Sequence, residues 1–173
     1  MNLLFVHDHK FYTDKGIFYS RGGLPSNIWD RYLRYFSSII VIGRKLHDRN
    51  SGLVKSSKNK IKFKLIKEYN NPLDEFLNSK IIDNHIINSI KQVDGVVVRL
   101  PSILGFRAIN LSKKLNKPYA IEVVGCGWDS YWYYGNLKGK LMAFIAYNRM
   151  KKNVLKSKFT IYVTKSFLQN RYK

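Results

Sequence analysis

The sequence predicts an α/β protein: a Rossmann-like parallel sheet with helices on both faces, formed as one domain over residues 1–173. Short apolar runs of strand length alternate with helical patterns, as in βαβ units. The first apolar run begins almost at the amino terminus, at Leu3. The stretch 118–134, PYAIEVVGCGWDSYWYY, joins a buried strand to a small-residue turn and an aromatic cluster. A chain of this length builds one core but not two ordinary domains.

The first third of the chain reads as strand, glycine loop and helix. Residues 3–8 form the first strand, and the polar residues 9–19 are expected to be a loop. Ser26 or Asn27 then caps a helix. Its apolar face consists of Ile28, Trp29, Tyr32, Leu33 and Phe36. A second strand covers 38–43, and residues 44–60 are expected to be a mobile loop because they are rich in Lys, Ser, Asn and Gly.

The middle and end of the chain continue the alternation. Residues 61–66 alternate apolar residues with lysine, as an edge or half-exposed strand does. Asn71 and Pro72 then break the chain before one or two helices over 73–93. A buried strand over 95–101 and a clean amphipathic helix over 104–115 lead to the strand that starts at Tyr119. The pattern ends with a helix over 141–155, a strand over 159–164 and a helix that starts in 165–173. The basic and apolar residues of the helix over 141–155 do not sort onto two faces.

The charge balance is strongly basic. Thirty-one lysine and arginine residues against 11 aspartate and glutamate residues give a formal net charge of +20, and no acidic residue follows Asp129. This balance predicts an anionic partner such as phospholipid, nucleic acid or a phosphorylated ligand, or else simply a lysine-rich composition with solvated faces. The opening residues have no signal-peptide pattern and no stretch reaches transmembrane length, so we expect a cytoplasmic protein.

Ligands of open α/β sheets bind beyond the carboxyl ends of the strands, so the functional residues are expected there. Gly22 and Gly23 lie between a strand and a helix, where backbone N–H groups either hold a phosphate or make a plain tight turn. His7 is expected to line the cleft at a polar strand end, and no metal site is expected, because alternation separates His7 and His9 from Asp8 and no second ligand cluster follows.

The second candidate region is the loop after the strand at Tyr119. Asp129 either accepts a proton from an acceptor hydroxyl or simply forms a turn. Glu122 either points into the cleft or pairs with a cation such as Arg99, because a buried unpaired carboxylate is costly. Gly125, Gly127 and Trp128 are expected to line the same cleft. Cys126 is the only cysteine and is expected to be a small buried filler rather than a nucleophile.

Aromatic residues followed by lysines predict a surface for an anionic partner. The predicted membrane-surface patch comprises Trp132, Tyr133, Lys138, Lys140, Lys151 and Lys152. Amphipathic rings favour the headgroup zone of a bilayer and lysines favour anionic lipid. There are three alternatives to a membrane surface for these aromatic residues, Tyr134 among them. They could stack on the bases of single-stranded nucleic acid, stack on sugars, or simply pack in the core and at its rim.

Five segments also carry a family resemblance: LLFVHD, RGGLP, SIIVIGR, IEVVGCGWDSYWYYGNLKGK and FTIYVTKSFLQNRYK. They resemble the N-terminal domain of bacterial family 4 glycosyltransferases, the kind found in capsule and surface-polysaccharide clusters. VGCGWDS and YVTKSFLQNRY carry it most strongly, and the likeness covers the whole chain more loosely. Many members of this family place a His after the strand that corresponds to the one starting at Tyr119, and this sequence lacks it.

The resemblance implies one half of the two-domain GT-B fold and a retaining transfer without a metal or other cofactor. The implied partners are a nucleotide-sugar donor, a lipid-linked saccharide acceptor and the anionic inner face of the cell membrane. Gly22 and Gly23 would lie by the donor diphosphate, and the loop 125–129 would line the acceptor side. The donor-binding C-terminal half, with its E-x7-E motif, would begin after Tyr172, so this chain alone is expected to bind without turnover.

Two other functions fit the sequence. A basic nucleic-acid-binding module would explain the charge and the interleaved aromatic residues, although no nucleic-acid motif appears. A stand-alone nucleotide-sugar binding domain would need no catalytic partner.

Overall fold

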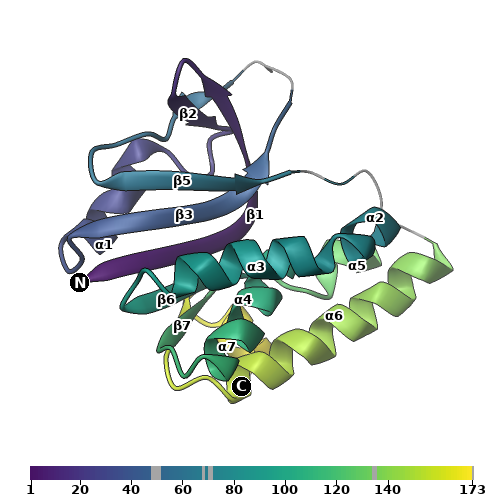
Figure 1. Cartoon of the computed structure of the whole chain (residues 1–173). Coiled ribbons are helices and arrows are strands. Elements are labelled where there is room, and N and C mark those ends of the chain that lie inside the picture. Colours follow the sequence, from purple (N-terminus) through teal and green to yellow (C-terminus); the bar gives the residue numbers. More distant parts are fainter. Residues whose placement is uncertain (48–51, 68, 70–71, 134–135, 173) are drawn as a thin grey trace.

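The computed structural model describes residues 1–47, 52–67, 69, 72–133 and 136–172 (Figure 1). The predicted chain break at Asn71, the aromatic Tyr134 and the final Lys173 lie outside the described residues.

The fold is built on a parallel sheet. Its strands are β1 (Asn2–Asp14), β3 (Ser38–Lys45), β5 (Ile61–Ile66), β6 (Gly95–Leu100), β7 (Tyr119–Val123) and β8 (Thr160–Tyr162). They pair in the order β5-β3-β1-β6-β7-β8, with every pairing parallel. This is the strand order of a doubly wound sheet, in which the chain reverses its direction of growth between β1 and β6. The predicted fold class is confirmed.

The loop predicted over 9–19 is wrong, because β1 runs on to Asp14 and then turns back. Lys15 and Gly16, with φ values of 44° and 78°, make the two-residue turn to β2 (Ile17–Ser20), which pairs with β1 in antiparallel fashion. Phe18 stacks on Phe63 of β5, with ring centroids 4.4 Å apart. This packing between residues distant in sequence gives order to a segment that is polar by composition.

A similar contact changes part of the loop expected over 44–60. Residues 44 and 45 belong to β3, and β4 (Val54–Lys55) pairs with β2. Residues 48–51 of that expected loop lie outside the described residues.

Two hydrophobic clusters, one on each face of the sheet, form the core. Helices α3 (Ser79–Ile90), α4 (Ile103–Lys114), α6 (Leu137–Leu155) and α7 (Phe167–Tyr172) cover one face. The other face is covered by the short 3-10 helix η1 (Ser26–Trp29) and by α1 (Asp30–Leu33), whose Trp29 and Tyr32 pack on Phe5.

The helix predicted after the glycine loop is therefore present, but it is short. The N-cap predicted at Ser26 or Asn27 is wrong, because Pro25 occupies that position and no side chain caps the helix. Pro25 at the start, rather than a hydroxyl or amide, sets the entry of the chain into η1.

Two short helices stand near the end of the molecule toward which the parallel strands point: α2 (Pro72–Leu77) and α5 (Asp129–Trp132). Helix α6 begins at Leu137, ahead of the expected residue 141, because the side-chain oxygen of Asn136 accepts a 2.7 Å hydrogen bond from the Gly139 N–H. The predicted strands and helices of the second half of the chain are otherwise confirmed.

Candidate functional site

A pocket of about 540 Å³ lies at the carboxyl ends of the parallel strands, and we call it the edge pocket. The strand ends contribute its polar wall, and α2, α4, α5 and α6 close it. The lining residues are Asp8, Lys10, Arg44, Tyr69, Glu75, Pro101, Ser102, Ile103, Phe106, Ser130, Tyr131 and Ala146. This position is where doubly wound sheets bind their ligands, since the loops there diverge on either side of the reversal in strand order.

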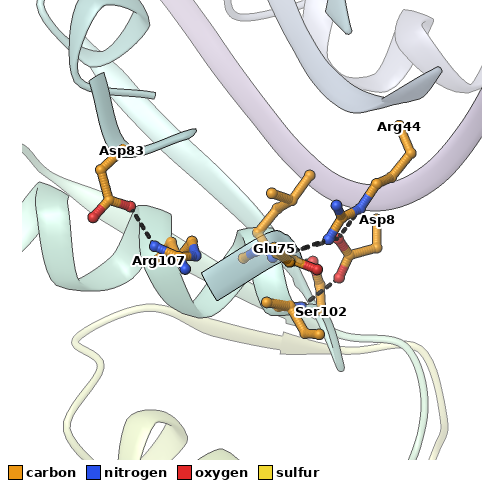
Figure 2. Close-up of polar contacts among 9 residues, drawn as sticks. Asp8, Arg44, Glu75, Asp83, Ser102 and Arg107 are labelled. Carbon is orange, nitrogen blue, oxygen red and sulfur yellow. Dashed lines mark hydrogen bonds and ion pairs between the residues drawn. The ribbon is translucent and has the colours of Figure 1, made fainter. Parts of the chain in front are cut away.

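An ionic frame holds the wall of the edge pocket (Figure 2). Arg44 Nε donates to Asp8 Oδ1 at 3.0 Å, and Arg44 Nη2 donates to Glu75 Oε1 at 2.8 Å. Burial by itself lowers the pKa of Arg44, but the two carboxylates outweigh it and raise that pKa overall. The buried guanidinium therefore stays charged and ties β1, β3 and α2 together.

Asp8 also occupies the amino terminus of α4. Its carboxylate accepts hydrogen bonds from the backbone N–H groups of Ile103 and Leu104. A helix amino terminus is a favourable place for an anion, and here a side chain of the protein itself fills it. A ligand phosphate would have to displace Asp8 to bind there, so this edge of the pocket favours uncharged polar groups.

The rest of the edge pocket combines rings with hydrogen-bonding groups. Tyr69, Phe106 and Tyr131 supply apolar faces, while Ser102 and Ser130 supply hydroxyl groups. Pockets that bind small molecules have this mixture, with apolar walls for area and a few polar groups for orientation. A sugar fits the mixture well, because its C–H faces stack on rings and its hydroxyls need donors and acceptors.

The other face of the sheet carries a histidine cluster. The rings of His7 and His9 stack with centroids 6.3 Å apart. Burial, and then the charge of Arg99, lower the pKa of His9 to about 4. Burial also lowers the pKa of His7 to about 4, against an opposing effect of Asp8 and with further lowering by Arg99 and His9. Both rings are therefore neutral at pH 7.

His9 is also held in one orientation. Its Nε2 lies 2.8 Å from Ser20 Oγ, and that oxygen accepts a 3.0 Å hydrogen bond from the Leu24 N–H. Ser20 Oγ therefore links the His9 ring to the backbone of the glycine loop that leads into η1.

Gly22 and Gly23 lie beside His9 and make a tight turn. The Gly22 N–H donates to the Ser20 carbonyl at 3.0 Å, and the Gly23 N–H donates to the Arg21 carbonyl at 2.7 Å. A Cβ on Gly23 would stand 3.1 Å from His9 Cε1, so a larger residue there would press against the His9 ring. The geometry fits the tight-turn alternative, since a phosphate would have to open both turns to reach these N–H groups.

Glu122 pairs with cations rather than lining the edge pocket. Glu122 is buried, with 3% of the residue exposed. Its carboxylate lies 2.9 Å from Arg31 Nη2 and 3.2 Å from Arg99 Nε. The Tyr32 hydroxyl donates to Glu122 Oε1 at 2.6 Å. Burial first and the Glu122 charge second raise the pKa of Tyr32, so its hydroxyl remains a donor.

Asp129 stands next to the edge pocket but faces another partner. Its Oδ2 accepts from Arg171 Nη1 of α7 at 3.1 Å, while Ser130 and Tyr131, the next two residues, line the pocket. Trp128 stacks on Trp132 with centroids 4.6 Å apart.

The two glycines of this loop allow close packing. A Cβ on Gly125 would stand 3.3 Å from Pro101, and one on Gly127 would stand 3.2 Å from the Ala146 carbonyl. Cys126 between them is buried, as expected of a small filler.

Sequence reasoning missed the edge pocket's ionic frame. The sequence pattern places Asp8 in a polar strand end and Arg44 at the start of a loop, and it does not single out Glu75. The sequence did carry a signal, because Asp8, Arg44 and Ser102 each come at or just after the end of a buried apolar run. Parallel strands bring such positions to one edge of the sheet.

Large apolar side chains of α6 face outward. The buried positions of this helix are Gly139, Ala143, Ala146, Met150 and Val154, most of them small. The exposed positions include Leu137, Leu141, Phe144 and Ile145, with exposed fractions of 84%, 62%, 58% and 47%. Trp132 and Tyr133 of the predicted patch are also exposed, and we call these six residues the α5–α6 surface. A soluble helix normally buries its large apolar residues, so the reverse arrangement indicates a partner surface.

Lysines of the predicted patch lie beside this surface. Lys138, Lys140 and Lys152 are exposed, and Lys140 Nζ lies 5.4 Å from the Trp132 ring centroid. Lys151 is half-buried, 6.0 Å from the ring of Tyr147.

The comparisons with known proteins point to one curated relative. The chain is 39% identical to Protein CapJ of Staphylococcus aureus. That match covers 99% of this chain but only 44% of CapJ, so the chain spans less than half the length of the relative. No family model matches the chain.

A crystal structure of a UGT transferase from Siraitia grosvenorii in complex with UDP aligns with 91% of this chain and 34% of its own. The TM-score is 0.46 and the sequence identity 14%, a likeness too weak to assign a ligand.

Two further observations concern the described residues alone. No group of three or more His, Cys, Asp or Glu side chains among them is placed to hold a metal ion. None of the helices in the described ranges combines the length and apolar character needed to cross a membrane.

Proposed function

We propose that this chain binds the saccharide acceptor of a glycosyltransferase, and that the reaction belongs to the synthesis of a capsule or other surface polysaccharide. The edge pocket carries the proposal, because it combines three aromatic rings with hydroxyl groups at the ligand-binding edge of a doubly wound sheet. The similarity to CapJ and the family 4 resemblance support the capsule and transferase parts.

In this proposal a nucleotide-sugar is the donor and the rest of the transferase is supplied by a second domain or subunit of the GT-B kind. The acceptor hydroxyl oxygen bonds to the anomeric carbon, the nucleoside diphosphate leaves with the electron pair of the broken bond, and the hydroxyl proton is released. Asp129 remains our candidate to receive that proton, because it directly precedes the pocket residues Ser130 and Tyr131. We retain Gly22 and Gly23 as candidates for the donor diphosphate, with opening of their turns as a requirement.

Membrane attachment is part of the same proposal. A lipid-linked acceptor reaches the protein from the bilayer surface, and the exposed α5–α6 surface beside Lys138 and Lys140 suits an anionic headgroup zone. The attachment that we propose is peripheral, through this exposed surface.

Saturation-transfer NMR tests the acceptor site. The probe is a water-soluble hexose linked to a short-chain prenyl phosphate. We expect signals from the sugar ring with the natural protein and their loss in Tyr131→Ala, since Tyr131 lines the pocket. Tyr35→Ala is the matched control, because Tyr35 is 75% exposed and is not a pocket residue.

Equal signals in both variants would contradict the acceptor site. An oligonucleotide titration in parallel addresses the nucleic-acid alternative. If the affinity for oligonucleotide exceeds the affinity for the hexose probe and falls steeply with salt, nucleic-acid binding would replace the transferase proposal.

A further inference from the structure

A second exposed apolar surface lies on α2 and the start of α3. Phe76, Leu77 and Ile81 have exposed fractions of 71%, 70% and 66%, and we call these residues the α2 corner. The helical pattern over 73–93 includes them among its apolar positions, and the structure leaves all three exposed. Large apolar side chains that gather in water usually mark an interaction site.

The α2 corner and the α5–α6 surface border the same pocket. Glu75 lines the edge pocket and is followed directly by Phe76 and Leu77. Tyr131 lines the pocket from α5 and is followed directly by Trp132 and Tyr133. Figure 1 shows α2, α5 and the amino-terminal end of α6 at one end of the molecule, the end toward which the parallel strands point.

The charges around the α2 corner suit an anionic surface. Exposed Lys80 directly precedes Ile81, as exposed Lys138 and Lys140 accompany the α5–α6 surface. Of the three carboxylates on α2 and α3, two are neutralised by ion pairs, Glu75 with Arg44 and Asp83 with Arg107, each at 2.8 Å (Figure 2). Apolar residues beside exposed lysines are a combination that binds an anionic phospholipid surface.

We propose that the α2 corner and the α5–α6 surface insert together into the interfacial zone of an anionic bilayer, so that the edge pocket is held at the membrane. The purpose of this arrangement rests on the proposed function: a lipid-linked acceptor keeps its tail in the bilayer while its sugar enters the pocket. Attachment through α5 and α6 alone leaves the pocket free to tilt away. Attachment on α2 as well fixes the pocket against the lipid.

Vesicle co-sedimentation tests the surface without any saccharide. The vesicles contain equal parts of phosphatidylglycerol and phosphatidylcholine. The double variant Phe76→Ser, Leu77→Ser is expected to bind about tenfold more weakly than the natural protein, because two large apolar contacts are lost. The control Phe159→Ser, Ile161→Ser changes residues of matching exposure, 65% and 59%, at the β8 edge, and is expected to bind within about twofold.

A depth measurement gives the orientation. A fluorophore on Leu77→Cys, in a Cys126→Ala background, is expected to be quenched by bromine-labelled lipids, and the same fluorophore on Ile161→Cys is not. Equal loss of binding in both double variants, no loss in the α2 variant, or quenching at position 161 would each overturn the proposal.

Two more outcomes separate this inference from the proposed function. In the first, the natural protein does not bind vesicles but self-associates with rising concentration, and the α2 variant does not self-associate. This result would assign the surface to contact with a second copy of the chain and overturn the membrane proposal. Vesicle binding that depends on α2, in a protein that does not bind the hexose probe, would support the membrane surface while removing the acceptor site.

Discussion

The hydroxyl of Tyr172 accepts a 2.8 Å hydrogen bond from the backbone N–H of Gly127. Tyr172 is fully buried, and its oxygen also lies 3.3 Å from Cys126 Sγ. One contact thus fixes helix α7 to the loop that carries Asp129 and the pocket residues Ser130 and Tyr131. Burial is the main cause of the raised pKa of Tyr172, and it keeps the hydroxyl protonated.

Tyr172→Phe is expected to destabilise the fold by about 1–2 kcal/mol, because the buried Gly127 N–H loses its acceptor. Chemical denaturation followed by circular dichroism measures the change. Tyr172→Ala should cost about 3–5 kcal/mol by adding a cavity. An unchanged free energy of unfolding in Tyr172→Phe would show that the hydrogen bond adds nothing to stability.

Glu122→Ala is expected to cost about 3 kcal/mol, because it leaves Arg99 and the Tyr32 hydroxyl buried without their carboxylate. Arg31 matters less, since its side chain is 46% exposed. The control is Asp30→Ala, which breaks the exposed pair with Lys58 and should cost less than about 1 kcal/mol. Similar losses in both variants would contradict the structural role of Glu122.

Stability is expected to fall as the pH drops from about 6.5 to about 4. The folded-state pKa of His7 and of His9 is lowered to about 4 from 6.5, so the unfolded chain binds protons first over this range. Each histidine contributes a slope of at most about 1.4 kcal/mol per pH unit. Thermal melts between pH 4 and 7 measure it.

The double variant His7→Gln, His9→Gln should flatten that pH dependence, and His47→Gln, which changes an exposed ring, should leave it intact. A steep fall that persists in the double variant would assign the effect to other groups.

Gly43→Ala is expected to destabilise the fold by about 1–3 kcal/mol, because the new Cβ would stand 2.6 Å from Phe11 Cε2 and 2.7 Å from the His9 carbonyl oxygen. Gly95→Ala is the matched control: it too lies in a parallel strand, but its Cβ would meet nothing nearer than 3.9 Å. Equal midpoints in urea for the two variants would argue against this close approach of β1 and β3.

Asp8→Asn is expected to loosen the edge pocket. The substitution weakens the charged contact with Arg44 and with the amino terminus of α4, at a cost of about 1–2 kcal/mol. Asp14→Asn, in the hairpin turn of β1, is the control and should be nearly neutral. Hydrogen exchange at Ile103 and Leu104 reports the loosening directly, and unchanged exchange there would contradict the capping role.

The regular elements were predictable because they depend on local patterns. Apolar runs such as SIIVIG and GVVVRL have strand length, and the helix α4 has a clear apolar face. The hairpin formed by β1 and β2 was not predictable in this way. Its residues are mostly polar, and it is ordered by the Phe63 ring of β5, which comes much later in the chain.

The candidate site divides in the same way. The sequence by itself determined the fold class, the carboxyl edge as the place for a ligand, and the alternative that Glu122 pairs with Arg99, because a buried carboxylate needs a cation. Only the tertiary structure decided that Asp8, Arg44 and Glu75 meet in one wall, and that α6 buries its small residues while exposing its large ones. The physical reason is that the pairing of charged side chains and the burial of apolar ones depend on which distant segments pack together. Local periodicity does not encode that packing.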